Sequence, residues 1–272
     1  MRLSFAGSGY VGLVSAVGFC LKGHEVACID VDKGKVTEIN AGRPPFYEKG
    51  LGEALNKALI TKRFKATTDY SSVRHADVVF ICVGTPSGPD GSADLSYIEA
   101  ATKAVAGELA KTEKFVVVAV KSTVLPGTTE KVVKPILAAK AKNVGVGMVP
   151  EFLKEGTALE AFERPDRIVI GTDGKKTRRV LTDLHASFQC MLIQTDCKTA
   201  EMIKYASNSL LAAKISFANE LANICDLAGI NVDEVVAGMA LDKRIGPHFL
   251  KAGPGFGGSC FPKDVRALKA FA

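Results

Sequence analysis

Residues 2–12, Arg-Leu-Ser-Phe-Ala-Gly-Ser-Gly-Tyr-Val-Gly, decide the fold of this chain. The apolar start predicts a buried strand, and the apolar run that continues through Leu21 predicts a helix. Between them lie Gly7, Gly9 and Gly12, where glycines allow a tight turn and let a pyrophosphate approach the helix N-terminus. This order predicts a dinucleotide-binding unit, with an ordinary tight strand-to-helix turn as the structural alternative.

The next predicted strand, residues 25–30, ends at Asp30. A carboxylate at this place can accept hydrogen bonds from a ribose diol and would repel a 2′-phosphate. The sequence therefore favours NAD over NADP as the cofactor. Lys35 follows shortly, either near the adenosine side of the cofactor or as an exposed helix lysine.

Strands and helices alternate along the first two thirds of the chain. The expected strands are residues 2–6, 25–30, 78–83, 115–120, 144–149 and 167–170. The expected helices include residues 32–40, 51–60, 94–110 with Asp94 as a candidate cap, and 128–141 with a kink at Pro135. Near-continuously apolar strands separated by helices are typical of a parallel sheet covered on both faces. We expect an α/β, doubly wound, Rossmann-like NAD-binding domain over residues 1–195.

The remaining residues, 196–272, predict a different, helical region. Residues 197–228 contain neither proline nor glycine, and Ile203 begins an apolar series that recurs every seven residues through Leu210, Phe217 and Ile224. A helix of this length usually bridges domains or pairs with a copy of itself. A shorter helix is expected next, beginning at Asn231 or Asp233 and reaching Ala240.

A glycine-rich loop near the end of the chain contains one cysteine. Residues 253–264 read Gly-Pro-Gly-Phe-Gly-Gly-Ser-Cys-Phe-Pro-Lys-Asp. Pro262 can open a helix, which would place Cys260 just before a helix N-terminus. There the helix dipole and Lys263 both favour the thiolate, so Cys260 is a candidate nucleophile. The other six cysteines lie in apolar or periodic segments and are expected to be core residues with free thiols, as in a reducing cytoplasm.

Three further groups are candidates, each with an ordinary structural alternative. Thr85 and Thr123 follow predicted strands, where a hydroxyl can contact a cofactor or can simply cap a turn. Glu151 and Glu155 follow another strand, and their spacing alone favours a solvated helix start. Lys204 and Asn208 share one face of the long helix, where spacing alone favours a solvated pair over an oxyanion site.

Composition limits the classes of partner. The chain has 272 residues, a net charge of +6, 47% hydrophobic residues and no tryptophan. No basic stripe interleaves with aromatic residues, so we expect no nucleic-acid partner. No run approaches the roughly 18 apolar residues of a membrane span, and the N-terminus enters the glycine motif directly, which argues against a signal peptide. We expect neither a membrane partner nor a metal site.

Together the motifs resemble the UDP-glucose/GDP-mannose dehydrogenase family along the whole chain. The matching segments are GSGYVG at 7–12, VGTP at 83–86, KST at 121–123, PEFLKEGTA at 150–158, RPDRIVIG at 164–171, KYASN at 204–208 and GFGGSCFPKD at 255–264. The cysteine motif is the most specific of these. It and the RPDRIVIG segment are closer to the UDP-glucose branch than to the GDP-mannose branch.

The resemblance implies oxidation of the C6 alcohol of a nucleotide sugar, such as UDP-glucose, to a carboxylate with two NAD. Cys260 would form a thiohemiacetal and then a thioester, which water hydrolyses. Lys204 and Asp264 would stabilise oxyanions or position water, Asn208 would hold the sugar oxygen, and Glu151 with Thr123 would handle the water and the proton. The resemblance places at the NAD site Gly7, Gly9, Tyr10, Val11, Gly12, Asp30, Lys35, Thr85, Thr123, Glu155 and Lys263. It places at the substrate Glu151, Phe152, Leu153, Lys204, Asn208, Arg244, Lys251, Phe256 and Gly257, with Arg244 reaching the substrate of a neighbouring subunit in a homodimer formed through the long helix.

The chain also departs from the family. Family members continue beyond the position of Ala272 into a second α/β domain that binds the uridine diphosphate. The sequence is therefore expected to be either a fragment or a natural truncation that folds, binds NAD and dimerises but turns over slowly. Two alternatives stay open: a β-hydroxyacid dehydrogenase, which transfers one hydride without a cysteine, and a truncated, non-catalytic NAD-binding module.

Overall fold

A mostly parallel sheet organises the larger of two units into which the chain divides. The computed structural model describes residues 1–272. The first unit consists of Met1–Pro86 and Asp94–Lys204, and the second consists of Ser87–Ala93 and Tyr205–Ala272.

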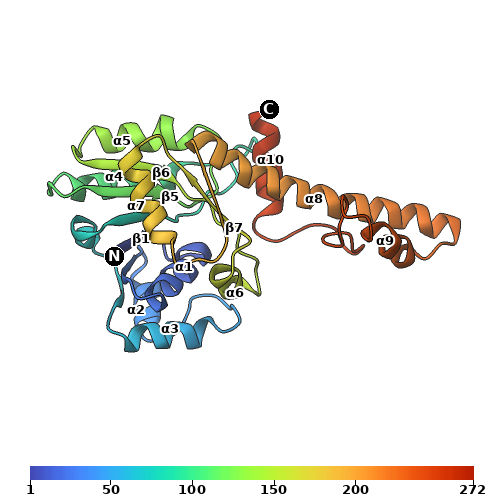
Figure 1. Ribbon diagram of the computed structural model, residues 1–272, viewed down its shortest axis with the longest axis horizontal. Helices are drawn as coiled ribbons and strands as arrows, with labels where there is room; N and C mark the ends of the chain where they lie inside the picture. Colours follow the sequence, from blue (N-terminus) through green and yellow to red (C-terminus); the bar gives the residue numbers. More distant parts are fainter. The chain divides into compact units, whose positions relative to one another are not determined.

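The sheet lies in the first unit and has the strand order β3-β2-β1-β4-β5-β6-β7-β8 (Figure 1). The strands are β1 (Arg2–Ala6), β2 (Glu25–Ile29), β3 (Phe64–Thr67), β4 (Val78–Ile81), β5 (Val116–Val120), β6 (Val144–Met148), β7 (Arg167–Gly171) and β8 (Met191–Thr195). β1 pairs in parallel with both β2 and β4, so the strand order reverses at β1. Open α/β sheets bind ligands at the carboxyl edge of such a reversal. The expected Rossmann-like α/β fold is confirmed.

β7 departs from the fully parallel sheet that the sequence predicts. It runs antiparallel to β6, with Met148 opposite Gly171. The segment 149–166 between these strands contains only one short helix, α6 (Ala158–Glu163). A parallel return requires a crossover that carries the chain back along the sheet. Because the chain instead re-enters the sheet from the carboxyl edge of β6, β7 runs in the opposite direction.

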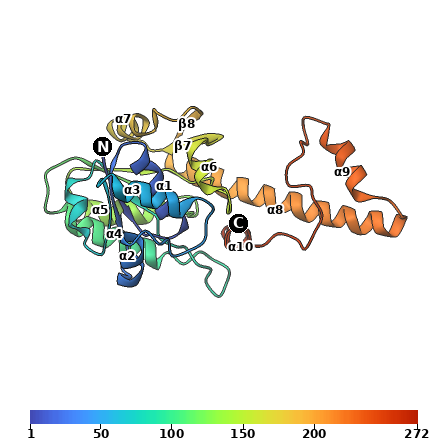
Figure 2. The same cartoon turned by 90° about the horizontal axis from the view of Figure 1, so that it is seen from below.

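Helices cover both faces of the sheet (Figures 1 and 2). One core cluster joins the sheet to α1 (Tyr10–Leu21), α2 (Lys33–Asn40), α3 (Leu51–Ile60), α6 and α7 (Lys175–His185). The other joins it to η1 (Tyr70–His75, a 3-10 helix), α4 (Ser96–Leu109), η2 (Thr129–Val133, a π-helical turn), α5 (Lys134–Ala138) and the start of α8. Side chains alternate between the clusters along each strand, as Phe80 and Val79 do in β4.

The helix expected over residues 128–141 is broken into η2 and α5. Pro135 lies in the first turn of α5, so the irregular turn precedes the proline. Proline lacks an N–H donor and its ring crowds the carbonyl four residues earlier, which disfavours regular helix there. In the preceding helix, α4, the N-cap residue is Leu95, and the Asp94 carboxylate, one residue earlier, accepts the Ser96 N–H at 2.8 Å.

The second unit is built on one long helix. α8 (Cys197–Ala228) runs unbroken, as predicted, and its residues from Tyr205 onward belong to this unit together with α9 (Val232–Ala240) and α10 (Phe261–Phe271). Lys214 Nζ donates to the Ile245 carbonyl at 3.0 Å, and Asn219 Oδ1 accepts the Gly253 N–H at 3.1 Å. These bonds tie the loops that follow α9 to α8. None of the helices in the structure is both long enough and apolar enough to cross a membrane.

Candidate active site

The glycine-rich turn between β1 and α1 depends on the absence of side chains. Gly7 has φ +106°, and a Cβ there would lie 2.7 Å from the Cys82 carbonyl oxygen. A Cβ on Gly12 would lie 1.9 Å from the Gly7 carbonyl oxygen, so the helix can start this close to the strand only with glycine. A Cβ on Gly9 would meet no atom within 4 Å, which leaves open space beside the helix N-terminus.

Asp30 stands directly after β2 and holds this turn. Its Oδ2 accepts the Ser8 N–H at 2.9 Å and the Ser8 hydroxyl at 2.6 Å, and its Oδ1 accepts the Asp32 N–H at 3.0 Å. Burial alone would raise the pKa of Asp30, but these hydrogen bonds and the nearby Lys35 ammonium lower it. Oδ1 accepts only one of these hydrogen bonds and keeps a lone pair, so Asp30 can still accept a hydrogen bond from a diol.

The first turn of α1 fits a dinucleotide pyrophosphate. Gly9 is the N-cap residue, no side chain caps the helix, and the first turn contains no acidic residue. Tyr10 and Val11 follow Gly9, and their N–H groups belong to those that lack helical acceptors. An uncapped helix start beside a ligand-accessible glycine is suited to an anion.

Glu48 connects this turn to the loop after β6, a contact that the sequence does not predict. Glu48 is buried, and its carboxylate accepts the Tyr10 hydroxyl at 2.5 Å and the N–H groups of Gly156 and Ala158 at 2.8 and 2.9 Å. Burial would raise the pKa of Glu48, but the hydrogen bonds lower it. An acid in the loop 41–50 has no local pattern that would identify partners more than a hundred residues away.

The threonines that follow β4 and β5 lie together at the sheet edge. The Thr85 hydroxyl donates to the Thr123 carbonyl at 2.9 Å, and the Ser122 hydroxyl donates to the Val83 carbonyl at 2.6 Å. Thr85 is buried and Thr123 is half-buried. This places both predicted threonines at the edge where the sheet order reverses.

Glu151 and Lys204 form a buried ion pair within the first unit. Glu151 Oε1 lies 2.9 Å from Lys204 Nζ, and Oε2 accepts the Leu153 N–H at 2.6 Å. Lys204 Nζ also lies 5.4 Å from the centre of the Phe152 ring. The solvated helix start that spacing favoured for residues 151–155 is therefore wrong: the segment is not helical, and Glu151 is buried. Glu155, at its far end, is exposed.

Cys260 heads α10 in the second unit, as the sequence predicts. It is the N-cap residue, its side chain caps no backbone group, and it is exposed, whereas the other cysteines are buried or half-buried. Ser259 Oγ lies 3.5 Å from Cys260 Sγ. The thiol is therefore accessible to a reaction partner.

A hydrogen-bonded cluster lies one turn into α10. Asp264 is 1% exposed, and its Oδ2 accepts Asn208 Nδ2 at 2.7 Å while its Oδ1 pairs with Lys263 Nζ at 2.6 Å. Asn208 and Lys204 are both buried, so the solvated pair that spacing favoured on α8 is wrong. The second unit thus brings together Asn208, Lys263 and Asp264 near Cys260 on α10.

Other predicted substrate residues lie on exposed parts of the second unit. The Arg244 guanidinium pairs with Asp242 at 2.7 Å and is exposed. Lys251 and Gly257 are exposed, and Phe256 is half-buried. No cluster of three or more His, Cys, Asp or Glu side chains in the structure is placed to hold a metal ion.

Comparison with known families assigns the two parts of the chain. Residues 1–189 match the NAD-binding domain of the UDP-glucose/GDP-mannose dehydrogenase family, and residues 198–272 match the central domain of that family.

Two curated relatives are similar over nearly the whole chain. A UDP-glucose 6-dehydrogenase of Rhizobium meliloti (strain 1021) is 47% identical over 276 residues, which cover 98% of this chain and 62% of the relative. UDP-glucose 6-dehydrogenase YwqF of Bacillus subtilis (strain 168) is 45% identical over 281 residues, covering 100% of this chain and 62% of the relative. The chain thus spans 62% of the length of these relatives.

Two solved structures share the fold. A UDP-glucose dehydrogenase from Pyrobaculum islandicum has a TM-score of 0.97 and 46% identity, with 99% of this chain and 63% of that chain covered. A GDP-mannose dehydrogenase from Pseudomonas aeruginosa has a TM-score of 0.88 and 39% identity, with 100% of this chain and 64% of that chain covered.

Proposed function

Because this chain belongs to the UDP-glucose/GDP-mannose dehydrogenase family, we propose that it provides the NAD site and the nucleophile for oxidation of UDP-glucose to UDP-glucuronate. The observation that carries the proposal is the exposed Cys260 at the start of α10, beside the cluster of buried Asn208 and Asp264 with half-buried Lys263. Identities of 45–47% to the UDP-glucose dehydrogenases named above, against 39% to the GDP-mannose enzyme, favour the glucose substrate.

The first unit is the NAD-binding domain of the family, and its residues fit that cofactor. The turn around Gly9 would hold the pyrophosphate, and Asp30 would accept the ribose hydroxyls, with Lys35 close to Asp30. Thr85 and Thr123 would line the cofactor at the sheet edge. When bound, NAD accepts a hydride, and two such transfers remove the four electrons that separate an alcohol from a carboxylate.

Cys260 explains how both oxidations can take place without release of the aldehyde. Its Sγ adds to the carbonyl carbon, the carbonyl oxygen takes up a proton, and the product is a thiohemiacetal. Loss of a hydride and of the hydroxyl proton gives a thioester. Water then adds to the thioester carbon, the C–S bond breaks, and the thiol is regenerated beside the free acid.

The two buried clusters suit the charges that arise during these steps. Lys204 carries an ammonium group held by Glu151, so it can stabilise an oxyanion, while Glu151 can accept a proton from the attacking water. Asp264 holds the amide of Asn208 in place, and that amide would bind the sugar oxygen. Lys204 and Asn208 are four residues apart in α8, so their side chains share one face of that helix.

We also infer a homodimer formed through α8. Leu210, Phe217 and Ile224 recur every seven residues on this helix and are 63%, 53% and 56% exposed in the single chain. Apolar side chains repeated on one helical face are suited to pairing with the same face of a second copy. In that arrangement the exposed Arg244 would reach the substrate of the neighbouring subunit.

Replacement of Cys260 by serine tests the proposed nucleophile. The variant should still reduce NAD in the first oxidation but should form no UDP-glucuronate, because the thioester cannot form. The matched control is Cys190→Ser, since Cys190 is half-buried outside both clusters. Normal UDP-glucuronate formation by Cys260→Ser would contradict the proposal and would favour a one-hydride dehydrogenase.

A further inference from the structure

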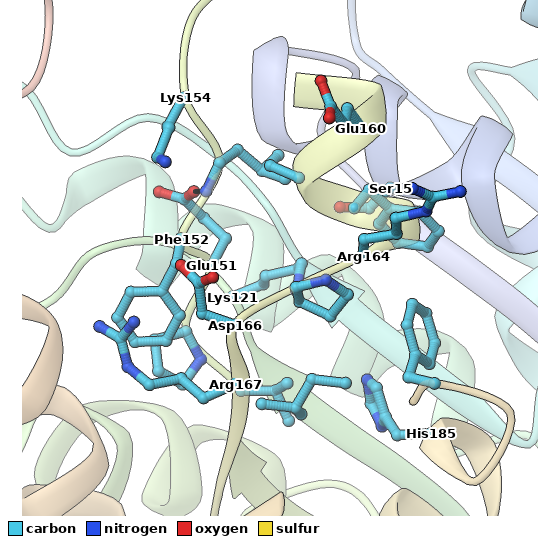
Figure 3. A pocket seen from close by; sticks show the side chains of 18 of the residues that line it. Ser15, Lys121, Glu151, Phe152, Lys154, Glu160, Arg164, Asp166, Arg167 and His185 are labelled. Carbon is cyan, nitrogen blue, oxygen red and sulfur yellow. Dashed lines mark hydrogen bonds between the residues drawn. The ribbon is translucent and has the colours of Figure 1, made fainter. Parts of the chain in front are cut away.

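A cavity within the first unit is lined in part by the loop that follows β6 (Figure 3). Its volume is about 290 Å³. The lining includes Glu151, which is buried and paired with Lys204, together with an inner wall of buried side chains that have no place in the dehydrogenase chemistry. These inner residues are Ser15 and Phe19 of α1, Lys121 at the end of β5, Phe162 of α6, His185 of α7 and Phe188.

The lining contains two buried charges, Lys121 and Glu151, and of these only Lys121 lacks a hydrogen-bonded or ion-paired partner. The residue is 7% exposed, yet its ammonium group makes no hydrogen bond or ion pair with the protein. The nearest ring is that of Phe80, whose centre lies 5.7 Å from Nζ. Buried ammonium groups are normally paired, because removal from water is costly for a charge that no counter-ion compensates. An unpaired Lys121 therefore points to an anion that the protein itself does not supply.

Two further polar atoms on the inner wall, Ser15 Oγ and His185 Nε2, also lack hydrogen-bond partners. Ser15 Oγ is fully buried and makes no hydrogen bond. His185 Nδ1 lies 2.7 Å from the Leu181 carbonyl oxygen, so Nδ1 carries the proton. Burial lowers the pKa of His185 to about 4, so the ring is neutral and its Nε2 is a free hydrogen-bond acceptor. The wall thus offers N–H donors, a hydroxyl and one acceptor, set among phenylalanine rings.

The charged groups around Lys121 do not neutralise it. The Glu151 carboxylate favours the charged form of Lys121 through space, but its hydrogen-bonded partners are Lys204 Nζ and the Leu153 N–H, and it makes no ion pair with Lys121. The Cys82 thiol is buried, and burial raises its pKa to about 12, so it is neutral. The other titratable or charged groups that face the cavity are His185 and, at the rim, Lys154, Glu160, Arg164, Asp166 and Arg167.

We propose that the inner part of this cavity binds a small oxyanion that still carries a hydroxyl group. The anionic oxygens would accept hydrogen bonds from Lys121, and the ligand hydroxyl would donate to His185 Nε2. The Ser15 hydroxyl can donate to an anionic oxygen of the ligand or accept from its hydroxyl group. Hydrogen phosphate, hydrogen carbonate and small hydroxy acids share this chemistry.

The size of the cavity agrees with such a ligand. A liquid water molecule occupies about 30 Å³, so a cavity of about 290 Å³ has room for a small polyatomic anion together with ordered water. The aromatic rings of Phe19, Phe162 and Phe188 lower the local dielectric constant, which strengthens the attraction between Lys121 and an anion.

Calorimetric titration of the chain with inorganic phosphate tests the proposal. It is carried out with NAD present, so that the phosphate-binding turn of α1 is filled. We expect saturable binding that Lys121→Met weakens about tenfold or more, because a hydrogen bond to a charged group is lost. Ser15→Ala should weaken it severalfold. The control, Lys175→Met, removes an exposed lysine from α7 and should change nothing. Hydrogen carbonate should compete, whereas chloride, which has no hydroxyl, should compete poorly.

The pH dependence gives a second test. Burial lowers the pKa of Lys121, so its charge is lost at a lower pH than for an exposed lysine. Anion binding should therefore weaken as pH rises, and Lys121→Arg should retain binding at the higher pH. The proposal is wrong if phosphate does not bind saturably, or if its affinity is the same in Lys121→Met and the parent chain. If Lys121→Met fails to fold, an unchanged affinity in Ser15→Ala overturns the assignment.

Discussion

Single buried carboxylates connect distant loops in the first unit. Glu48 is the clearest case, because one side chain holds the Tyr10 hydroxyl and two backbone N–H groups of the 156–158 segment. Asp30 does the same for the glycine-rich turn through Ser8. The predicted cofactor side of the site therefore depends on acceptors as well as on glycines.

We predict that Glu48→Ala lowers the free energy of unfolding by about 2–4 kcal/mol, because two backbone donors and a tyrosine hydroxyl lose their acceptor. Glu113→Ala, at an exposed acid with no side-chain partner, should change it by less than about 0.5 kcal/mol. Denaturant titration measures both. The folded-state pKa of Glu48 is lowered, so its contribution is present above the ordinary value near 4 and is lost as pH falls through the folded pKa. Equal stabilities of the two variants would contradict this role.

At Asp30 we predict discrimination between cofactors. The chain should bind NAD at least about tenfold more tightly than NADP, since the Asp30 carboxylate repels a 2′-phosphate. Asp30→Asn should weaken NAD binding and strengthen NADP binding, so that the ratio of the NAD affinity to the NADP affinity decreases. Asp183→Asn, at an exposed acid on α7, is the control. Fluorescence titration with both dinucleotides gives the ratio, and equal affinities in the parent chain would refute the assignment.

Accessibility predicts which thiol reacts first. Under native conditions iodoacetamide should modify Cys260 rapidly, since it is the exposed cysteine. The others are buried except Cys190, which is half-buried and whose pKa is raised by burial. Peptide mapping by mass spectrometry identifies the modified residue. Rapid labelling of the Cys260→Ser variant at another site would show that the accessible nucleophile has been misassigned.

Local patterns identify some residues of the candidate site but not their partners. The spacing of Gly7, Gly9 and Gly12, and the placement of Cys260 before a proline, can be interpreted directly because they describe one turn each. Spacing alone assigned Glu151 and Lys204 to solvent, because it cannot indicate that they pair with one another. The partners of Glu48 and the surroundings of the Lys121 ammonium could not be predicted, because they come from segments far apart in the sequence.

At the scale of elements, α8 was predictable to the residue because it has one long pattern and no helix breaker. The edge strands β3 and β8 were not predicted. Polar residues such as Lys65 and Gln194 interrupt their apolar runs, since an edge strand need not be buried on both faces. The antiparallel direction of β7 depends on the path of the loop that precedes it, and hydrophobic periodicity does not predict the path of a loop.

The exposed stripe on α8 leads to a prediction about assembly. Phe217→Glu should convert a dimer of 28.7 kDa chains into monomers, because it places a charge at the centre of the apolar face. Met191→Glu changes an apolar residue of 72% exposure on β8 and should leave the dimer intact. Sedimentation equilibrium distinguishes these outcomes. If the parent chain sediments as a monomer at high concentration, α8 does not provide the interface that we propose.

At the scale of the whole molecule, the chain divides into two units, and each carries candidate residues of its own. Glu151 and Lys204 belong to the first unit, whereas Asn208, Cys260 and Asp264 belong to the second. The boundary between the units falls within α8, between Lys204 and Tyr205.

The central claim is that Cys260 allows two successive oxidations of one nucleotide sugar. The most direct measurement is the number of NADH formed per UDP-glucuronate when NAD is in excess and the chain is at a concentration above that of UDP-glucose, so that slow turnover does not limit detection. The account predicts two NADH per UDP-glucuronate, and none of this acid from Cys260→Ser. One NADH per sugar consumed by the parent chain, with the aldehyde or another two-electron product released, would contradict it.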